Sequence, residues 1–140
     1  MASNLVDFFG KNAEKLPEKE IIVSNRFKDN DGNPIPWKIK VLDAATQQRI
    51  RSEAMDMNVN DQKEVNVKFN SARMNLRTVA ASVVYPDLKD KDLQDCYGVA
   101  TPSALVGVML SDDEFERLLE AVNSLSAGTA PGTIEEEAKN

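Results

Sequence analysis

The sequence contains no histidine, so it lacks the side chain that proteins use most often as a general base or a metal ligand. Histidine-containing catalytic triads and histidine-ligated zinc hydrolases are therefore excluded. The glycines are isolated from one another, and no glycine-rich loop followed by lysine and serine or threonine is present to hold a phosphate group. We expect a protein that is not an enzyme and that uses no cofactor and no metal.

The single cysteine, Cys96, rules out an internal disulfide framework and fits a reducing compartment. Cys96 is also a poor candidate nucleophile, because Asp95 precedes it and no histidine is available as its base. We expect a structural, partly buried cysteine.

Long apolar runs are missing as well. The longest apolar stretch, residues 104–110, is far shorter than the roughly 20 residues that a membrane-spanning helix needs. Residues 1–9 have neither the basic start nor the continuous apolar segment of a secretory signal. We therefore expect no membrane partner and a cytoplasmic location.

Positive charge is scarce relative to negative charge: 17 Lys and Arg stand against 23 Asp and Glu, for a net charge of −6. General nucleic-acid binding needs a net positive surface to neutralise phosphates, so no nucleic-acid partner is expected. The composition, 41% hydrophobic and 29% charged, is that of a packed globular protein. A chain of 140 residues is long enough for one domain with a substantial core.

The pattern of the chain predicts an α+β fold, with an N-terminal β-hairpin packed against about four to five helices in a single compact domain over residues 1–126. Within that domain, residues 1–17 form an N-terminal arm, residues 20–42 form the hairpin, and residues 43–126 are mostly helical. Residues 127–140 are rich in small and acidic side chains, and we expect them to form a disordered tail.

The hairpin prediction rests on two alternating runs that flank a turn-rich centre. At a period of two, the side chains that point inward are Ile21, Val23, Phe27, Trp37, Ile39 and Val41. The same period places four cations on the opposite face: Arg26, Lys28, Lys38 and Lys40. Two interpretations stay open, a docking site for an acidic partner or an ordinary solvated sheet face.

The centre of the hairpin, residues 29–33, resembles the start of a calcium-binding loop. Such a loop needs a bidentate glutamate at its twelfth position, where this chain has Lys40, and Pro34 falls inside it. We therefore interpret residues 29–33 as turn formers.

The N-terminal arm is predicted to form a short helix over residues 3–16, capped by Ser3, with Leu5, Phe8 and Phe9 on one side. This apolar group is either a lid on the core or an anchor for a partner.

The remaining helices are read from caps and apolar spacing. Asp43 is expected to cap a helix that runs to about Met57, followed by a polar loop over residues 58–64. A central core helix follows from Phe69 to Val83, then short helices near residues 90–97 and after Thr101. The last helix begins with a capping box at residues 111–114 and carries a regular apolar stripe.

Four separated blocks of sequence carry a family resemblance. The hairpin segment, residues 23–40, resembles the signature of the XkdN-like phage tail assembly chaperones. Three further blocks agree with that family in the same order: Tyr85-Pro-Asp-Leu88, Leu93-Gln-Asp-Cys-Tyr-Gly98, and Val108-Met-Leu110 with Glu114-Phe-Glu-Arg-Leu-Leu119. The resemblance covers about residues 4–128, which is nearly the whole predicted domain.

The resemblance implies a non-catalytic protein of the cytoplasm of an infected or lysogenic bacterial host, absent from the mature virion. It implies two partners: the tape measure protein, a long helical protein prone to aggregate, and the tail tube protein that polymerises around it. It leaves self-association open. The alternative is a phage structural or adaptor protein that remains in the tail.

The candidate partner-binding residues follow from the charge and apolar patterns of this sequence and not from the family resemblance. They are the basic face and the apolar arm: Arg26, Lys28, Lys38, Lys40, Leu5, Phe8 and Phe9.

Overall fold

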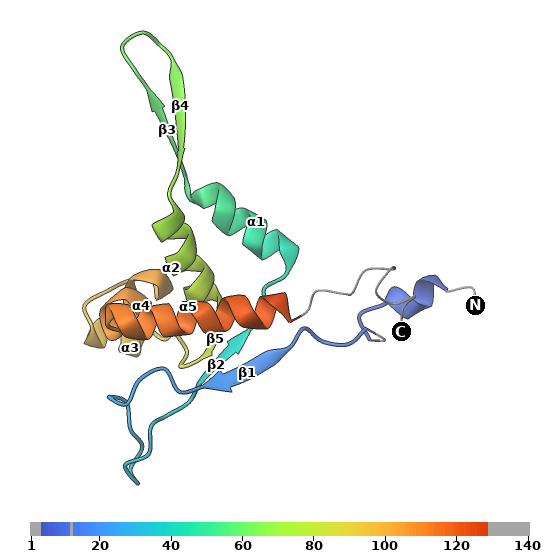
Figure 1. Ribbon diagram of the computed structural model, residues 1–140, viewed down its shortest axis with the longest axis vertical. Coiled ribbons are helices and arrows are strands. Elements are labelled where there is room, and N and C mark those ends of the chain that lie inside the picture. Colours follow the sequence, from blue (N-terminus) through green and yellow to red (C-terminus); the bar gives the residue numbers. More distant parts are fainter. Residues whose placement is uncertain (1–3, 12, 129–140) are drawn as a thin grey trace.

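The computed structural model describes residues 4–11 and 13–128, and it is built around a three-stranded antiparallel sheet (Figure 1). The strands β1 (Glu18–Ile21), β2 (Trp37–Lys40) and β5 (Val83–Tyr85) lie in the order β1-β2-β5. Strands β1 and β2 form the predicted N-terminal hairpin, with Ile21 opposite Trp37 and Glu18 opposite Lys40. The predicted α+β class with an N-terminal hairpin is therefore confirmed.

The turn at the tip of this hairpin forms as its sequence predicts. The Asp29 side chain accepts hydrogen bonds from the backbone N–H groups of Asp31 and Asn33, at 2.9 and 3.0 Å. Gly32 takes a left-handed conformation, with φ of 82°, which a residue without a Cβ adopts at low cost. A single carboxylate oxygen of Asp29, Oδ1, and the conformation of Gly32 therefore reverse the chain.

Within the described residues after the hairpin there are five α-helices: α1 (Ala44–Glu53), α2 (Ser71–Ser82), α3 (Lys91–Cys96), α4 (Pro102–Met109) and α5 (Asp112–Ala127). The predicted caps Asp43 of α1 and Ser111 of α5 each accept the expected backbone bond, from Thr46 and Glu114. Thr101, after which a helix was predicted, caps α4 in the same way. Gly98, with φ of 69°, follows α3 as predicted.

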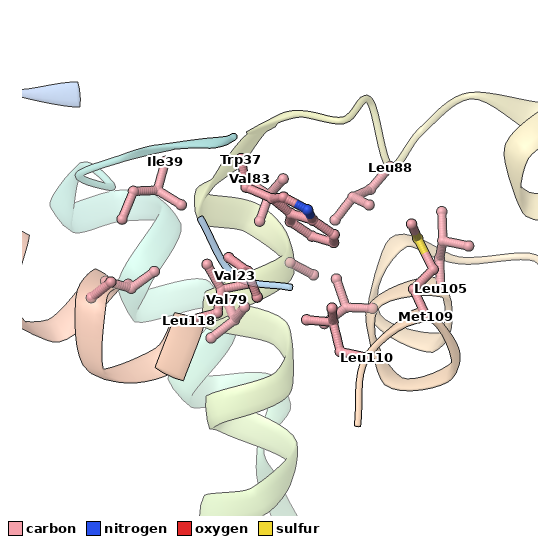
Figure 2. Packing of buried hydrophobic residues seen from close by; sticks show 14 residues of the cluster. Val23, Trp37, Ile39, Val79, Val83, Leu88, Leu105, Met109, Leu110 and Leu118 are labelled. Carbon is pink, nitrogen blue, oxygen red and sulfur yellow. The ribbon is translucent and has the colours of Figure 1, made fainter. Parts of the chain in front are cut away.

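The core lies between the sheet and helices α2, α4 and α5 (Figure 2). Trp37 and Ile39, on alternate positions of β2, are almost fully buried, and Val23 joins them from the segment after β1. The helices contribute a larger buried set: Val79, Ala80, Leu105, Val106, Met109, Leu118, Ala121 and Val122. Alternation in β2 and helical spacing in α2 and α5 therefore meet in one core.

A second β-hairpin corrects the prediction for residues 54–70. Helix α1 ends at Glu53, four residues before the predicted Met57. Strand β3 (Met55–Val59) takes up the end of that predicted helix and the start of the predicted loop, and β4 (Val65–Phe69) reaches the first residue of the next predicted helix. Both segments alternate apolar and polar residues at a period of two, and valine and phenylalanine favour strands. The Asn60 side chain accepts backbone bonds from Gln62 and Glu64 at the turn.

Strand β5 is a second correction. The central helix was expected to reach Val83, but α2 ends at Ser82 and Val83 pairs with Ile39 of β2. Val83 is still buried in the core, as its apolar character requires. Its β-branched side chain fits a strand position better than a helix end.

The N-terminal arm and Cys96 also differ from expectation. The arm contains a single 3-10 turn, η1 (Leu5–Phe8), capped by Asn4, in place of a helix over residues 3–16. Ser3, the predicted cap, lies outside the described residues. Cys96 is exposed and not partly buried, because it lies at the end of the short helix α3.

The predicted boundary of the domain at residue 126 nearly coincides with the end of α5 at Ala127. The predicted acidic tail falls mostly outside the described residues, so its disorder stays a prediction.

Candidate functional site

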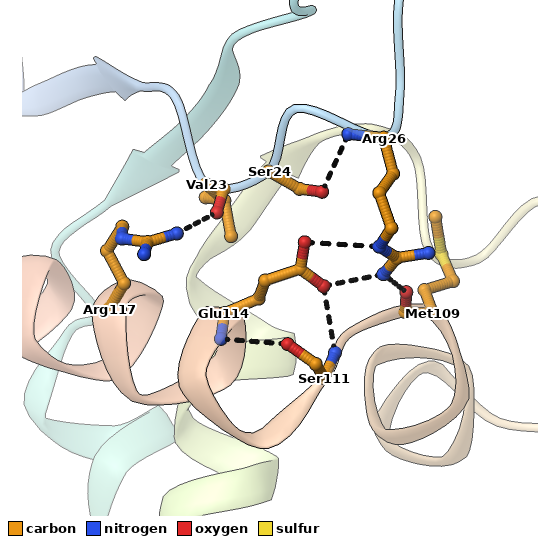
Figure 3. A network of polar contacts seen from close by, with 7 residues as sticks. All are labelled: Val23, Ser24, Arg26, Met109, Ser111, Glu114 and Arg117. Atoms are coloured by element: carbon orange, nitrogen blue, oxygen red, sulfur yellow. Dashed lines mark hydrogen bonds and ion pairs between the residues drawn. The ribbon is translucent and has the colours of Figure 1, made fainter.

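A polar network ties the segment after β1 to the start of α5 (Figure 3). The Arg26 guanidinium donates to both Glu114 carboxylate oxygens, at 2.5 and 3.2 Å, and to the Met109 carbonyl oxygen at 2.6 Å. On the same side, Arg117 Nη1 donates to the Val23 carbonyl oxygen at 2.6 Å. Two arginines therefore hold residues 23–26 against α4 and α5, over a sequence separation of more than 80 residues.

Glu114 serves two purposes in this network. Its carboxylate accepts the backbone N–H of Ser111 at 2.9 Å, and Ser111 Oγ accepts the backbone N–H of Glu114 at 3.2 Å, which completes the capping box of α5. The Arg26 guanidinium, then the Ser111 N–H and the Ser24 hydroxyl, hold the pKa of Glu114 well below its ordinary value. The Glu114 side chain is only 12% exposed, so its charge needs these partners.

Replacing Glu114 by alanine should lower the free energy of unfolding at neutral pH by about 1–2 kcal/mol, the loss of a cap and of charge-assisted bonds. Glu114→Gln keeps the capping geometry and removes the charge, so its loss should be smaller, limited further because Arg26 is 56% exposed. Urea unfolding of both variants and the wild type measures the two losses.

The same experiment repeated against pH tests the carboxylate itself. Folding lowers the pKa of Glu114, so its stabilisation is fully present above the ordinary glutamate value of about 4.3 and is lost as the pH falls below it. The gap between wild type and Glu114→Gln should therefore close in acid. A gap that stays constant from pH 7 to acid would contradict the ion pair.

The four predicted cations do not gather on one free face. Arg26 turns toward α5, whereas Lys38 and Lys40 lie on the outer face of the hairpin together with Glu18 and Glu20, their cross-strand neighbours. Lys38 Nζ forms an ion pair with Glu18 Oε2 at 2.9 Å, which lowers the pKa of Glu18 and raises the pKa of Lys38.

Two of those cations form no direct ion pair among the described residues. Lys28 lies near the hairpin tip, where it bridges to Pro34 through the backbone, and Lys40 ends β2. Neither belongs to any of the ion pairs that the described residues form. Lys28 and Lys40 are therefore the two of the four that remain available to a partner.

The arm residues do not cover the core. Leu5 is 76% and Phe8 is 74% exposed, and Phe9 is also exposed. The turn η1 lies beyond β1, away from the helices and the sheet (Figure 1). Of the two interpretations of this apolar group, the lid on the core is wrong, and the anchor for a partner stays a prediction.

A further apolar surface lies on the hairpin β3–β4, and the sequence patterns did not lead us to predict it. Six apolar side chains are exposed along it: Met55, Met57, Val59, Val65, Val67 and Phe69. The signal that reveals it is period-two alternation on both sides of a polar turn. Of these six residues, the predicted helices place only Met57 and Phe69 on core-facing sides, and the predicted polar loop includes Val59.

Other kinds of site find little support in the described part of the chain. No three Cys, Asp or Glu side chains among residues 4–11 and 13–128 are grouped as metal ligands would be. No helix in the same residues is long and apolar enough to cross a membrane. A shallow hollow between α1, α2 and α5 is lined mainly by neutral side chains, and its Asp43 already caps α1.

Comparison with known proteins places the chain in a family. Residues 5–139 match the family described as phage XkdN-like tail assembly chaperone protein. The chain is 31% identical over 134 residues to the phage-like element PBSX protein XkdN of Bacillus subtilis strain 168, covering 94% of this chain and 89% of that protein.

A second protein of the same strain, the uncharacterized protein YqbN, is 28% identical over 95 residues, which cover 67% of this chain and 63% of YqbN. The crystal structure of the protein YqbN superposes with a TM-score of 0.73 over 91% of this chain and 98% of that chain. At 22% identity, this superposition shows a shared fold. From the match over residues 5–139 and the similarity to XkdN, the chain belongs to the family of XkdN-like phage tail assembly chaperones.

Proposed function

We propose that this chain binds the tape measure protein of a phage or prophage tail, keeps it soluble, and helps recruit tail tube subunits, without catalysing a reaction. Family membership supports the general role in tail assembly. The partners, the location in the host cytoplasm and the absence of catalysis are parts of the proposal.

The observation that carries the proposal is the exposed apolar arm. Leu5, Phe8 and Phe9 present large side chains to solvent on a segment that contributes no buried residue from its η1 turn. Exposed apolar clusters of this kind mark interaction sites, and leucine and phenylalanine fill grooves between the side chains of a helix. A long helical partner with uncovered apolar surface is the kind of client that such an arm suits.

Electrostatic attraction gives a secondary contribution. Lys28 and Lys40 form no ion pair among the described residues and can attract acidic segments of the client, whereas Arg26 and Lys38 are paired with Glu114 and Glu18. Exposed charges of this kind affect the rate of association more than the affinity. We therefore assign Lys28 and Lys40 to steering and the arm to affinity.

The alternative is a structural or adaptor protein that stays in the tail, and particle content separates the two. Purified tails assembled in the presence of this chain should contain almost none of it, because a chaperone leaves when tube subunits replace it. Quantitative mass spectrometry of the particles makes the measurement. Recovery in a fixed ratio to the tube subunit would overturn the chaperone proposal in favour of a tail component.

A further inference from the structure

The hairpin β3–β4 extends away from the rest of the molecule (Figure 1). Its register gives it two faces of different chemistry. Its register pairs Met55 with Phe69, Met57 with Val67, and Val59 with Val65. Residues directly opposite each other in an antiparallel pair share a face, so these three pairs form one continuous apolar face. The pairs Asp56–Lys68 and Asn58–Asn66 make the other face polar.

The apolar face is too exposed for a hairpin that stands alone in water. Its six side chains are between 44% and 70% exposed. Together they present on the order of 600 Å² of apolar surface, at the upper limit of what a soluble monomer shows in one patch. An isolated two-stranded hairpin is also only marginally stable without something packed on its apolar face.

We propose that this face is covered by the same face of a second copy of the chain, stacked about a two-fold axis with the two hairpins antiparallel. The sizes of the three pairs favour this arrangement. The pair at the base, Met55 and Phe69, is large, and the pair at the tip, Val59 and Val65, is small. Antiparallel stacking sets each large pair on a small one and the middle pair on itself, so the layer keeps an even thickness.

The charges around the hairpin favour the same occupant. The helix ends and the first polar strand pair at its base carry Arg49, Arg51, Lys68, Arg73 and Arg77 against Glu53 and Asp56, which leaves a net charge of +3. The tip carries Asp61 and Glu64 against Lys63, which leaves −1. Antiparallel stacking brings each acidic tip to a basic base, whereas parallel stacking would set like charges together.

The area is sufficient for a specific contact. Two such faces bury roughly 1,200 Å² in total, the lower limit for a stable protein–protein interface, before the tip and base contacts are added. No charged side chain lies within the six-residue face, so its burial leaves no unpaired charge.

The solution mass of the full chain tests the proposal. Sedimentation or light scattering at micromolar concentration should give twice the monomer mass of 15.5 kDa. Replacing Met57 and Val67 by aspartate puts charges at the centre of the face and should return the mass to that of the monomer. The matched control, Asn58→Asp with Asn66→Asp, adds the same charges to the polar face of the same strands and should leave the dimer intact.

Cross-linking in a Cys96→Ser background tests the antiparallel arrangement. A short thiol cross-linker should join two copies of Met57→Cys at the centre of the stack. It should not join two copies of Val59→Cys, but it should join Val59→Cys to Met55→Cys when the two variants are mixed. Efficient joining of Val59→Cys to itself would indicate parallel stacking and contradict the proposal.

A wild-type chain that stays monomeric overturns the proposal, and so does a dimer that survives both aspartate substitutions in the apolar face. If the wild-type chain is monomeric and Met57→Asp with Val67→Asp abolishes client capture, the apolar face binds the client instead of a second copy. The mass and cross-linking measurements use the chain alone, so their outcome is independent of the function proposed above.

Discussion

Replacing Trp37 by alanine is expected to lower the free energy of unfolding by about 3–5 kcal/mol, the usual cost of removing a large buried aromatic side chain. Trp37 is almost fully buried on β2, and its ring lies 6.2 Å from that of Phe27. Because natural domains are stable by only about 5–15 kcal/mol, this loss should lower the melting temperature by roughly 10 °C or more. Denaturant unfolding and thermal melts followed by circular dichroism give both values.

The neighbouring residue supplies the control for that variant. Lys38 points to the opposite face of β2, where it meets Glu18 in an exposed ion pair, so Lys38→Ala should change stability far less than Trp37→Ala. Equal losses for Trp37→Ala and Lys38→Ala would mean that the sheet does not bury the face that carries Trp37.

Replacing Leu5, Phe8 and Phe9 together by serine is expected to reduce capture of the tape measure protein by roughly tenfold or more, the effect of removing a central apolar anchor. The three side chains are exposed, so the fold should keep its melting temperature. Pull-down of the client from a co-expressing culture, with the amount recovered per chaperone, measures the loss.

A control variant removes as many exposed apolar side chains from elsewhere on the surface. Ile22→Ser, Val84→Ser and Val108→Ser change side chains that are between 39% and 52% exposed and that lie outside the N-terminal arm. Capture that falls equally in both triple variants would show a general effect of surface apolarity and would remove the arm as a specific anchor.

The parts of the fold that sequence predicted are those in which local chemistry and burial agree. The strand Trp37–Lys40 alternates, and its apolar residues face the core. Helix α5 has both a capping box and an apolar stripe that meets the core at Leu118 and Val122. Each of these two elements buries one face in the core, so the spacing of its apolar residues is enough to predict it.

The second hairpin escaped prediction because its apolar residues are not in the core. Alternation over Met55–Val59 and Val65–Phe69 was legible, but only five residues long on each side. The expectation that apolar side chains face inward favoured helices there, and the structure leaves those side chains exposed. A prediction that places every apolar side chain in the chain's own core fails for the apolar residues of β3 and β4.

The predicted basic face shows that periodicity gives the direction of a side chain but not its distant partner. A period of two correctly placed Lys38 and Lys40 on the outer face of the hairpin, but it gave no information about partners distant in sequence. Glu114 lies 88 residues from Arg26 and binds it, so Arg26 is a structural residue of the network at the start of α5. Only the tertiary structure reveals this contact.

The central claim is that this chain keeps a tape measure protein soluble by binding it. The most direct measurement is co-expression of the two, with the fraction of tape measure protein in the cleared lysate determined with and without the chaperone. We expect the soluble fraction to rise several-fold and the two proteins to co-purify, with the serine-substituted arm failing on both counts. An unchanged soluble fraction with no co-purification by the wild-type chain would contradict the claim.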